Sequence, residues 1–205
     1  SWRNSDDGFV RDVHVSKLII DPNNNNVFYA TTQGATEYTD KVGDGAGVFK
    51  SNDRGNSWTQ INNGLDSLET NILTVDPNDS ETLYLGTDDD GVYKSTDGGE
   101  SWKKLTVSSL SKSFGVGDII VDPQNSNNIY IGTVDYFRLS ESRGVLGDFG
   151  VYKSTDGGAT WEEFNAGLNH LGVFSLELSE ENRILYAGTR AVSYTHLTLP
   201  TTNSV

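Results

Sequence analysis

The sequence predicts an all-β fold, a β-propeller fragment of about three four-stranded blades with partial blades at each end. The first observation is a motif, S-x-D-x-G-x-[ST]-W, that occurs three times, with its tryptophans 44 and 59 residues apart. Self-similarity at such a period is the signature of a repeat architecture. The second observation is that each repeat holds apolar segments of four to six residues flanked by Gly, Asn, Asp or Pro, as short strands are. No stretch of ten or more residues keeps a helical apolar period.

The shortest repeat shows the order of elements within a blade. Its strands are expected at residues 72–75, 82–87, 91–95 and 102–105. Four strands in about 40 to 50 residues make one blade of a β-propeller. Aligned on this unit, the chain divides into blades at approximately 13–62, 70–107 and 116–165, followed by a partial blade at 172–191.

The repeated motif predicts a tight turn between the third and fourth strands of each blade. Its aspartate can accept hydrogen bonds from the backbone N–H groups just ahead of it, and its last glycine can adopt a positive φ. Its tryptophan begins the next strand and can bury its ring. Because an active site is rarely needed once per blade, we expect a structural role and not a ligand role. The twelve structural positions are Ser51, Asp53, Gly55, Trp58, Ser95, Asp97, Gly99, Trp102, Ser154, Asp156, Gly158 and Trp161.

The wording of the repeats resembles a known family. The segments Asp122-Pro-Gln-Asn125, Tyr84-Leu-Gly-Thr87, Gly91-Val-Tyr-Lys-Ser-Thr-Asp-Gly-Gly-Glu-Ser-Trp102 and Asn165-Ala-Gly-Leu168 are similar to those of Asp-box (bacterial neuraminidase) repeat propellers. The similarity covers nearly all of residues 1–191. It is closest to the branch that includes sortilin-type propellers, photosystem II assembly-factor propellers and xyloglucan-active glycosidases. The resemblance implies the fold and leaves the activity open, because such relatives include both enzymes and binders.

Both ends of the sequence are expected to be interrupted. Ser1-Trp2 stands where the last two residues of a box should be, so the start is expected to lie within a blade. After Thr189, a third strand with the wording G-V-Y-K-S should follow. Instead comes Val192-Ser-Tyr-Thr-His-Leu-Thr-Leu-Pro-Thr-Thr202, which resembles a translation of the adapter used in transposon-based DNA library preparation. We therefore expect residues 1–191 to be a partial propeller and residues 192–205 to be a sequencing artefact.

Composition excludes several classes of function. The chain carries 29 acidic against 15 basic residues, a net charge of −14, so neither nucleic acid nor an anionic membrane surface is expected as a partner. It has no cysteine, which removes disulfides and thiolate chemistry. No apolar run approaches 18 residues, so no membrane insertion is expected in this segment. We expect no metal site and no cofactor, with calcium at residues 88–90 as the alternative. The resemblance implies an extracellular, periplasmic or cell-surface location.

The loops that vary between repeats point to one face of the propeller. With the strands of a blade called A to D, the A–B and C–D turns are nearly constant, whereas the B–C loops (33–45, 88–90 and 134–149) differ widely. In an up-and-down blade, the B–C and D–A loops share one face. Loops on a rigid scaffold commonly carry binding or catalysis, so we expect the ligand there. The candidate ligand-binding residues are Tyr38, Asp88, Asp90, Asp135, Tyr136 and Phe137.

Asp88 is the one candidate for catalysis. In the xyloglucan-active relatives, a catalytic Asp follows strand B in the context T-D-x-G-G-x-Y. The segment Thr87-Asp-Asp-Asp-Gly-Val-Tyr93 resembles this context, but Asp90 stands where the first Gly would be. A turn or solvated surface position is therefore the preferred interpretation of Asp88. A sialidase is disfavoured, because it needs three arginines for the substrate carboxylate and Arg54 belongs to a box turn.

Two functions follow from these observations. The preferred one is a non-catalytic Asp-box propeller that binds a protein or carbohydrate ligand through its B–C and D–A loops. The alternative is a fragment of a secreted glycoside hydrolase, similar to a xyloglucanase or endoglucanase, with catalytic carboxylates on the same face. An enzyme of that kind should show two carboxylates facing each other across a cleft, about 5 to 10 Å apart.

Overall fold

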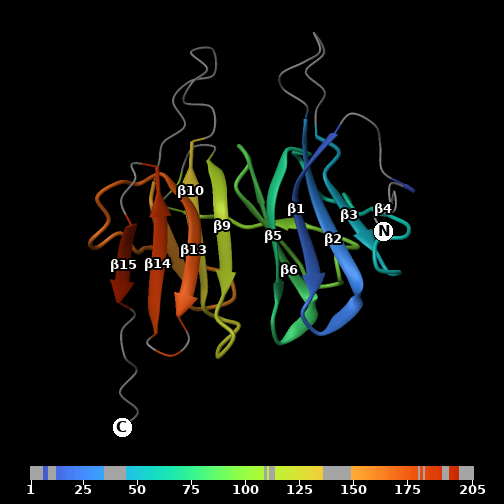
Figure 1. The fold of residues 1–205 in the computed structure, drawn as a ribbon. Helices are drawn as coiled ribbons and strands as arrows, with labels where there is room; N and C mark the ends of the chain where they lie inside the picture. Colours follow the sequence, from blue (N-terminus) through green and yellow to red (C-terminus); the bar gives the residue numbers. More distant parts are fainter. Residues whose placement is uncertain are drawn as a thin grey trace.

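The computed structural model describes residues 7–8, 13–34, 45–108, 110, 114–135, 149–179, 181, 183–190 and 194–198. Within these ranges the regular elements are β-strands only, arranged in four antiparallel sheets (Figure 1). Three sheets have four strands and the fourth has three, and each takes its strands in chain order. The prediction of an all-β, propeller-type fold is confirmed.

Each sheet corresponds to one repeat of the sequence. The first blade contains β1 (Val13–Asp21), β2 (Asn24–Gly34), β3 (Val48–Ser51) and β4 (Thr59–Gln60). The second contains β5 (Thr70–Asp76), β6 (Asp79–Thr87), β7 (Val92–Ser95) and β8 (Lys103–Lys104). The third contains β9 (Gly115–Val121), β10 (Ile129–Val134), β11 (Val151–Ser154) and β12 (Glu162–Glu163). The fourth contains β13 (Val173–Ser179), β14 (Ile184–Thr189) and β15 (Tyr194–Thr198).

The last strand, β15, occupies the third-strand position of its sheet. It pairs with β14 so that Gly188 lies opposite Tyr194, just as Gly86 lies opposite Val92 in the second blade. Residues 194–198 thus take the register in which the repeat would place its G-V-Y-K-S strand, although their sequence differs from it.

The core lies between neighbouring blades, because each inner strand packs on the blade before it. On β5, Leu73 and Val75 are 2% and 5% exposed and cluster with Tyr29 of the first blade. The matching residues of β1, Leu18 and Ile20, are 55% and 52% exposed. The alternating apolar pattern of these strands therefore serves the contact between blades. The side of β1 that carries Leu18 and Ile20 has the same apolar surface, but no blade packs on it among the described residues.

The turns and loops separate onto two opposite faces. On the box face, each Asp-box turn is joined to the A–B turn of its own blade, as in the 2.9 Å bond from Gly98 N to Glu81 O. On the loop face, the end of each B–C loop is joined to a D–A loop, as in the 3.0 Å bond from Gly91 N to Phe114 O. Figure 1 shows the A–B turns at the lower end of the strands, and the ends of β2 and β10, where two B–C loops begin, at the upper end.

Candidate functional site

The loop face is built on a threonine at the end of each second strand. In the third blade, the buried Thr133 hydroxyl donates to Gly150 O at 2.9 Å and accepts from Phe149 N at 3.0 Å. These two bonds join the two ends of the B–C loop. The same pair of bonds runs from Thr32 to Gly47 and Ala46 in the first blade, and from Thr87 to Gly91 and Asp90 in the second.

The closure is independent of loop length. Three residues separate Thr87 from Gly91, whereas 14 and 16 separate the matching residues of the first and third blades. A buried hydroxyl that satisfies one donor and one acceptor holds all three loops by the same bonds. The sequence predicted strands ending in Y-x-G-T but did not reveal this role of the threonine.

Glu69 makes a second pair of hydrogen bonds that holds the two ends of the first B–C loop. Its carboxylate accepts from Gly34 N at 2.9 Å and from Gly45 N at 2.8 Å, the described residues on either side of 35–44. Such charge-assisted bonds to backbone N–H groups are stronger than neutral ones. Glu69 belongs to the D–A loop of the first blade, so this loop supports the B–C loop beside it.

Asp88 of the second blade is hydrogen-bonded to Gln33 of the first blade and so links the two blades beside the first B–C loop. Gln33 Nε2 lies 2.9 and 3.0 Å from its two carboxylate oxygens. The aspartate is only 8% exposed, and burial raises its pKa to about 6, with the charges of Glu69 and Asp89 adding to the effect and the Gln33 bond opposing it. Of the two environments that the sequence suggested, a turn or a solvated surface, Asp88 occupies the turn and is buried beside the adjacent blade.

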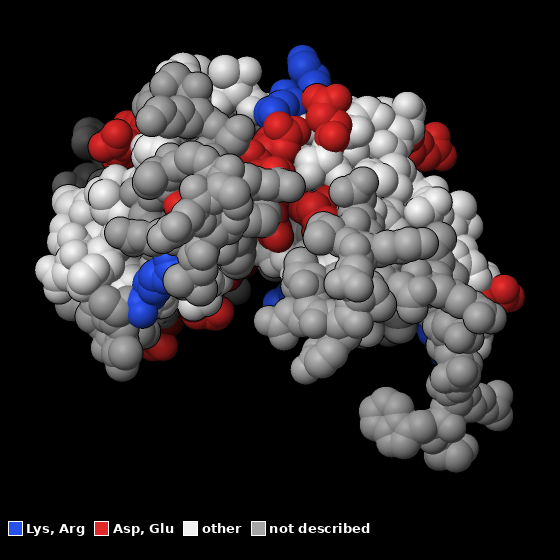
Figure 2. All heavy atoms as spheres, turned by 90° about the horizontal axis from the view of Figure 1, so that it is seen from above, with Lys and Arg blue, Asp and Glu red and all other residues white. Residues whose placement is uncertain are grey.

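The other candidate residues are placed as follows. Asp90 accepts the Tyr93 hydroxyl and pairs with Lys104, so it closes the second blade's short loop onto its own sheet. Asp135 follows β10 and is 1% exposed. Tyr38, Tyr136 and Phe137 lie outside the described residues. Figure 2 looks onto the loop face and shows Asp and Glu side chains gathered near its middle.

The described residues contain no group of three or more His, Asp or Glu side chains arranged to hold a metal ion. Within the same ranges there is also no helix with the length and apolarity needed to cross a membrane.

On the opposite face, the Asp boxes form closed hydrogen-bonded turns. Asp156 accepts Thr160 N at 2.8 Å and Thr160 Oγ1 at 2.6 Å, and these bonds, with one from Ser154, hold its pKa at about 2. The buried Ser154 hydroxyl also accepts Gly158 N at 2.9 Å. The same arrangement occurs around Asp53 and Asp97, whose pKa values are likewise lowered to about 2.

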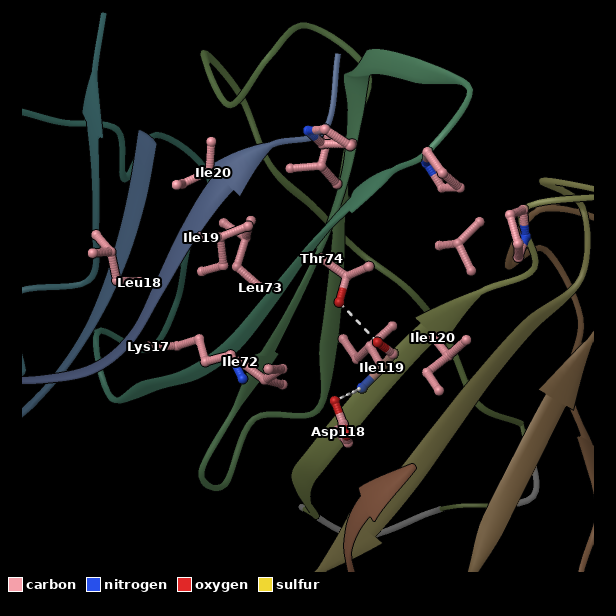
Figure 3. Close-up of a pocket in the computed structure, with 15 residues that line it drawn as sticks. Lys17, Leu18, Ile19, Ile20, Ile72, Leu73, Thr74, Asp118, Ile119 and Ile120 are labelled. Carbon is pink, nitrogen blue, oxygen red and sulfur yellow. Dashed lines mark hydrogen bonds between the residues drawn. The ribbon is translucent and has the colours of Figure 1, made fainter. Parts of the chain in front are cut away.

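A hollow of about 580 Å³ lies where the inner strands β1, β5 and β9 face one another (Figure 3). Its lining is mainly apolar, with Thr74 donating across it to Ile119 O at 2.8 Å. Asp118 accepts from Ile119 N at 2.9 Å and from Leu176 N at 2.8 Å. Burial raises the pKa of Asp118, and its bond from Leu176 N connects the third and fourth blades.

Comparison with known proteins places this chain. The model of the Sortilin-Vps10 family, described as sortilin, neurotensin receptor 3, matches residues 46–204. The chain belongs to the Sortilin-Vps10 family. No curated protein matches the sequence. The family assignment agrees with the resemblance found in the repeats, since the Sortilin-Vps10 family is one of the Asp-box propeller families.

Solved structures similar to this Sortilin-Vps10 chain include enzymes and a peptide complex. An ancestral GH74 enzyme is 23% identical with a TM-score of 0.70, over 89% of this chain and 22% of its own. The GH74 enzyme of Niastella koreensis is 29% identical with a TM-score of 0.60, over 84% of this chain and 25% of its own. YCF48 bound to D1 peptide is 12% identical with a TM-score of 0.60, over 91% and 51%. The chain thus spans about a quarter of each GH74 enzyme and half of YCF48.

Proposed function

We propose that the protein is a non-catalytic propeller that binds a protein or glycan through its loop face. The observation that carries the proposal is the threonine closure, by which Thr32, Thr87 and Thr133 hold B–C loops of very different length with the same two bonds. Variable loops on fixed anchors are the arrangement that recognition surfaces use.

Fixed anchors lower the cost of binding. Association has to order the loops that contact a ligand, and a loop whose ends are already held loses less conformational freedom. On the first loop, Glu69 adds two further bonds, to Gly34 N and Gly45 N. The Gln33–Asp88 pair then couples this loop to the second blade. The carboxylates of Glu69 and Asp88 are thus engaged in holding the framework.

The comparisons support binding in two ways. The family of this chain is named for a receptor, sortilin or neurotensin receptor 3. A structural neighbour with the same fold, YCF48, holds a D1 peptide. The family resemblance also supports our proposal of an extracellular, periplasmic or cell-surface location.

A glycoside hydrolase is the second candidate, because of Asp88. A carboxyl group with a pKa of about 6 stays largely protonated in mildly acidic solution, where an ordinary aspartate is ionised, and can act there as a general acid. The 29% identity to the Niastella koreensis GH74 enzyme favours the same function. In that case Asp88 would act as one member of a carboxylate pair.

An exchange of loops tests the binding proposal. Residues 134–149 are replaced by the Asp-Asp-Asp turn of residues 88–90, which keeps Thr133 and Gly150 as anchors. Phage-displayed random peptides and an array of xyloglucan and other β-glucan oligosaccharides serve as probes. We expect the exchanged protein to remain folded, with a lower melting temperature because buried Val134 is replaced, and to lose the ligands selected by the parent protein. Binding that survives the exchange would contradict the assignment to this loop.

Two variants of the anchor provide a matched control. Thr133→Val removes the hydroxyl at nearly constant volume, whereas Thr133→Ser retains it. We expect the first to weaken ligand binding and the second to preserve it. Hydrolysis of xyloglucan by the parent protein, abolished in Asp88→Asn, would instead establish the glycosidase.

A further inference from the structure

Each blade of this chain is fastened to the next blade's Asp box by a recurring set of contacts. Between the first and second blades, Lys50 Nζ donates to Gly98 O at 2.9 Å while its ammonium lies 5.6 Å from the Tyr29 ring centroid. Between the second and third blades, Lys94 Nζ donates to Gly157 O at 2.9 Å. The lysine of the V-x-K-S strand therefore caps the box turn that follows it in the ring.

An apolar side chain after each tryptophan forms the second contact. Ile61 Cδ1 lies 2.4 Å from the position that a Cβ on Gly99 would take, and Ile61 O accepts Trp102 Nε1 at 2.7 Å. One blade later, Leu105 Cδ1 lies 2.8 Å from the position that a Cβ on Gly158 would take. The last glycine of the box thus packs against an apolar side chain of the preceding blade, while its positive φ serves its own turn.

A glycine in the D–A loop forms the third contact. Gly64, with φ of +94°, lies directly against the backbone of Trp102, and Asn63 O accepts Trp102 N at 2.8 Å. The first described residues repeat this arrangement, since Asp7 O accepts Trp58 N at 2.9 Å. The blade before it therefore holds Trp102 at both its indole and its main chain, and holds Trp58 at its main chain.

The third blade carries the same lysine, apolar residue and glycine, and no box lies opposite them among the described residues. The Lys153 ammonium lies over the Phe164 ring at 5.8 Å and makes no hydrogen bond to any described residue. Phe164 stands three residues after Trp161, at the position of Ile61 and Leu105. Gly167 has φ of +95°, and no described atom lies within 4 Å of the place where its Cβ would be.

We propose that Lys153, Phe164 and Gly167 form a docking surface for an Asp-box hairpin with its tryptophan. The occupant we assign is the hairpin that would continue the fourth blade after its third strand, as the hairpins at 95–102 and 154–161 continue β7 and β11. The lysine would cap its glycine carbonyl, the phenylalanine would cover its last glycine, and Gly167 would admit its tryptophan backbone.

A graft of equal length tests this assignment. Residues 192–205 are replaced by the sequence of residues 90–103. The graft keeps the strand register, because Gly188 is paired with residue 194 just as Gly86 is paired with residue 92. In the parent chain, Lys153 should react with an acetylating reagent several-fold faster than Lys50 and Lys94, as followed by peptide mass spectrometry. In the graft, Lys153 should slow to the rate of these two. A folded graft in which Lys153 stays fast would overturn the proposal.

A second variant separates docking from general stability. Asn tolerates a positive φ but adds the Cβ that the tryptophan backbone would exclude. We expect Gly167→Asn to leave the melting temperature of the parent chain nearly unchanged and to lower that of the graft by several degrees. Equal effects in both would count against the surface.

The parent chain alone also decides the matter if the graft does not fold. Lys153 acetylation as slow as that of Lys94 would mean that the surface is already covered, which contradicts the proposal. Protection of Lys153 that grows with protein concentration would assign the surface to a second copy of this chain, and would overturn the hairpin as occupant.

Discussion

The Ser126 hydroxyl donates a 2.7 Å hydrogen bond to Asp76 Oδ1, across the boundary between the third and second blades. Asp76 also accepts Asn78 N at 2.9 Å and is 3% exposed. The same relationship recurs from Ser80 to Asp21. It recurs again as an ion pair from Arg183 to Asp122. In all three pairs, a residue at the same position of the repeat, in the A–B turn of one blade, bonds the aspartate in the A–B turn of the blade before it.

Removing one such link should loosen the boundary between two blades. Ser126→Ala leaves the buried Asp76 carboxylate with one bond fewer, and a lost bond to a charged group costs about 1–3 kcal/mol. We expect the midpoint of urea unfolding to fall accordingly. Ser108→Ala, at an exposed serine that has no hydrogen bond to any described residue, serves as the control. An equal fall in both variants would show that the link contributes nothing of its own.

The box serine should matter as much as the box aspartate. The Ser95 hydroxyl donates to Asp97 Oδ1 at 2.7 Å and accepts the buried Gly99 N at 2.9 Å. Ser95→Ala leaves that N–H without a partner, which costs about 1–3 kcal/mol. The exposed neighbour Thr96→Ala is the matched control. Chemical denaturation of both variants measures the difference, and a Ser95→Ala protein as stable as the control would refute this role.

How much the sequence could predict depends on the range of the interaction. Strand segments, box turns and the two faces follow from local patterns, since each turn is closed by residues within four positions of Asp97 or its equivalents. The Ser126–Asp76 link carries a readable signal, because a serine stands four residues after both Asp76 and Asp122.

The environment of the candidate site could not be read in the same way. Gln33 and Asp88 are 55 positions apart, and only the packing of two blades brings them together. Their burial likewise depends on the neighbouring sheet, which no property of a three-aspartate turn reveals. The threonine closure escaped prediction for a different reason, since a threonine at a strand end looks the same whether its hydroxyl is solvated or bonded.

Asp88 should make stability depend on pH. Its pKa is about 6 in the folded protein against about 3.9 in an unfolded chain, so between these values the folded state holds more protons. Stability therefore falls as pH rises through this window, by about 3 kcal/mol in total. In Asp88→Asn this contribution is absent, so the variant should gain stability relative to the parent as pH goes from 4 to 7.

The measurement is a series of urea unfolding curves at successive pH values. Glu100→Gln, which removes an exposed negative charge on the box face, is the control for the change in net charge. A constant difference between Asp88→Asn and the parent protein across the window would contradict the burial argument.

The segment from 192 to 205 gives the last prediction, which concerns the gene. Strand β15 lies in the register of a third strand, yet its sequence lacks the Val-Tyr-Lys-Ser that β7 and β11 share. An open sheet edge accepts any strand-forming segment through its backbone, so pairing alone does not make this sequence native. We expect long-read sequencing of the source DNA to show, after the codon of Ala191, a continuation close to G-V-Y-K-S-x-D-x-G. A native reading frame that encodes Val192 to Thr202 as printed would remove the adapter explanation. The third strand of the fourth blade would then have a native sequence that differs from that of β7 and β11.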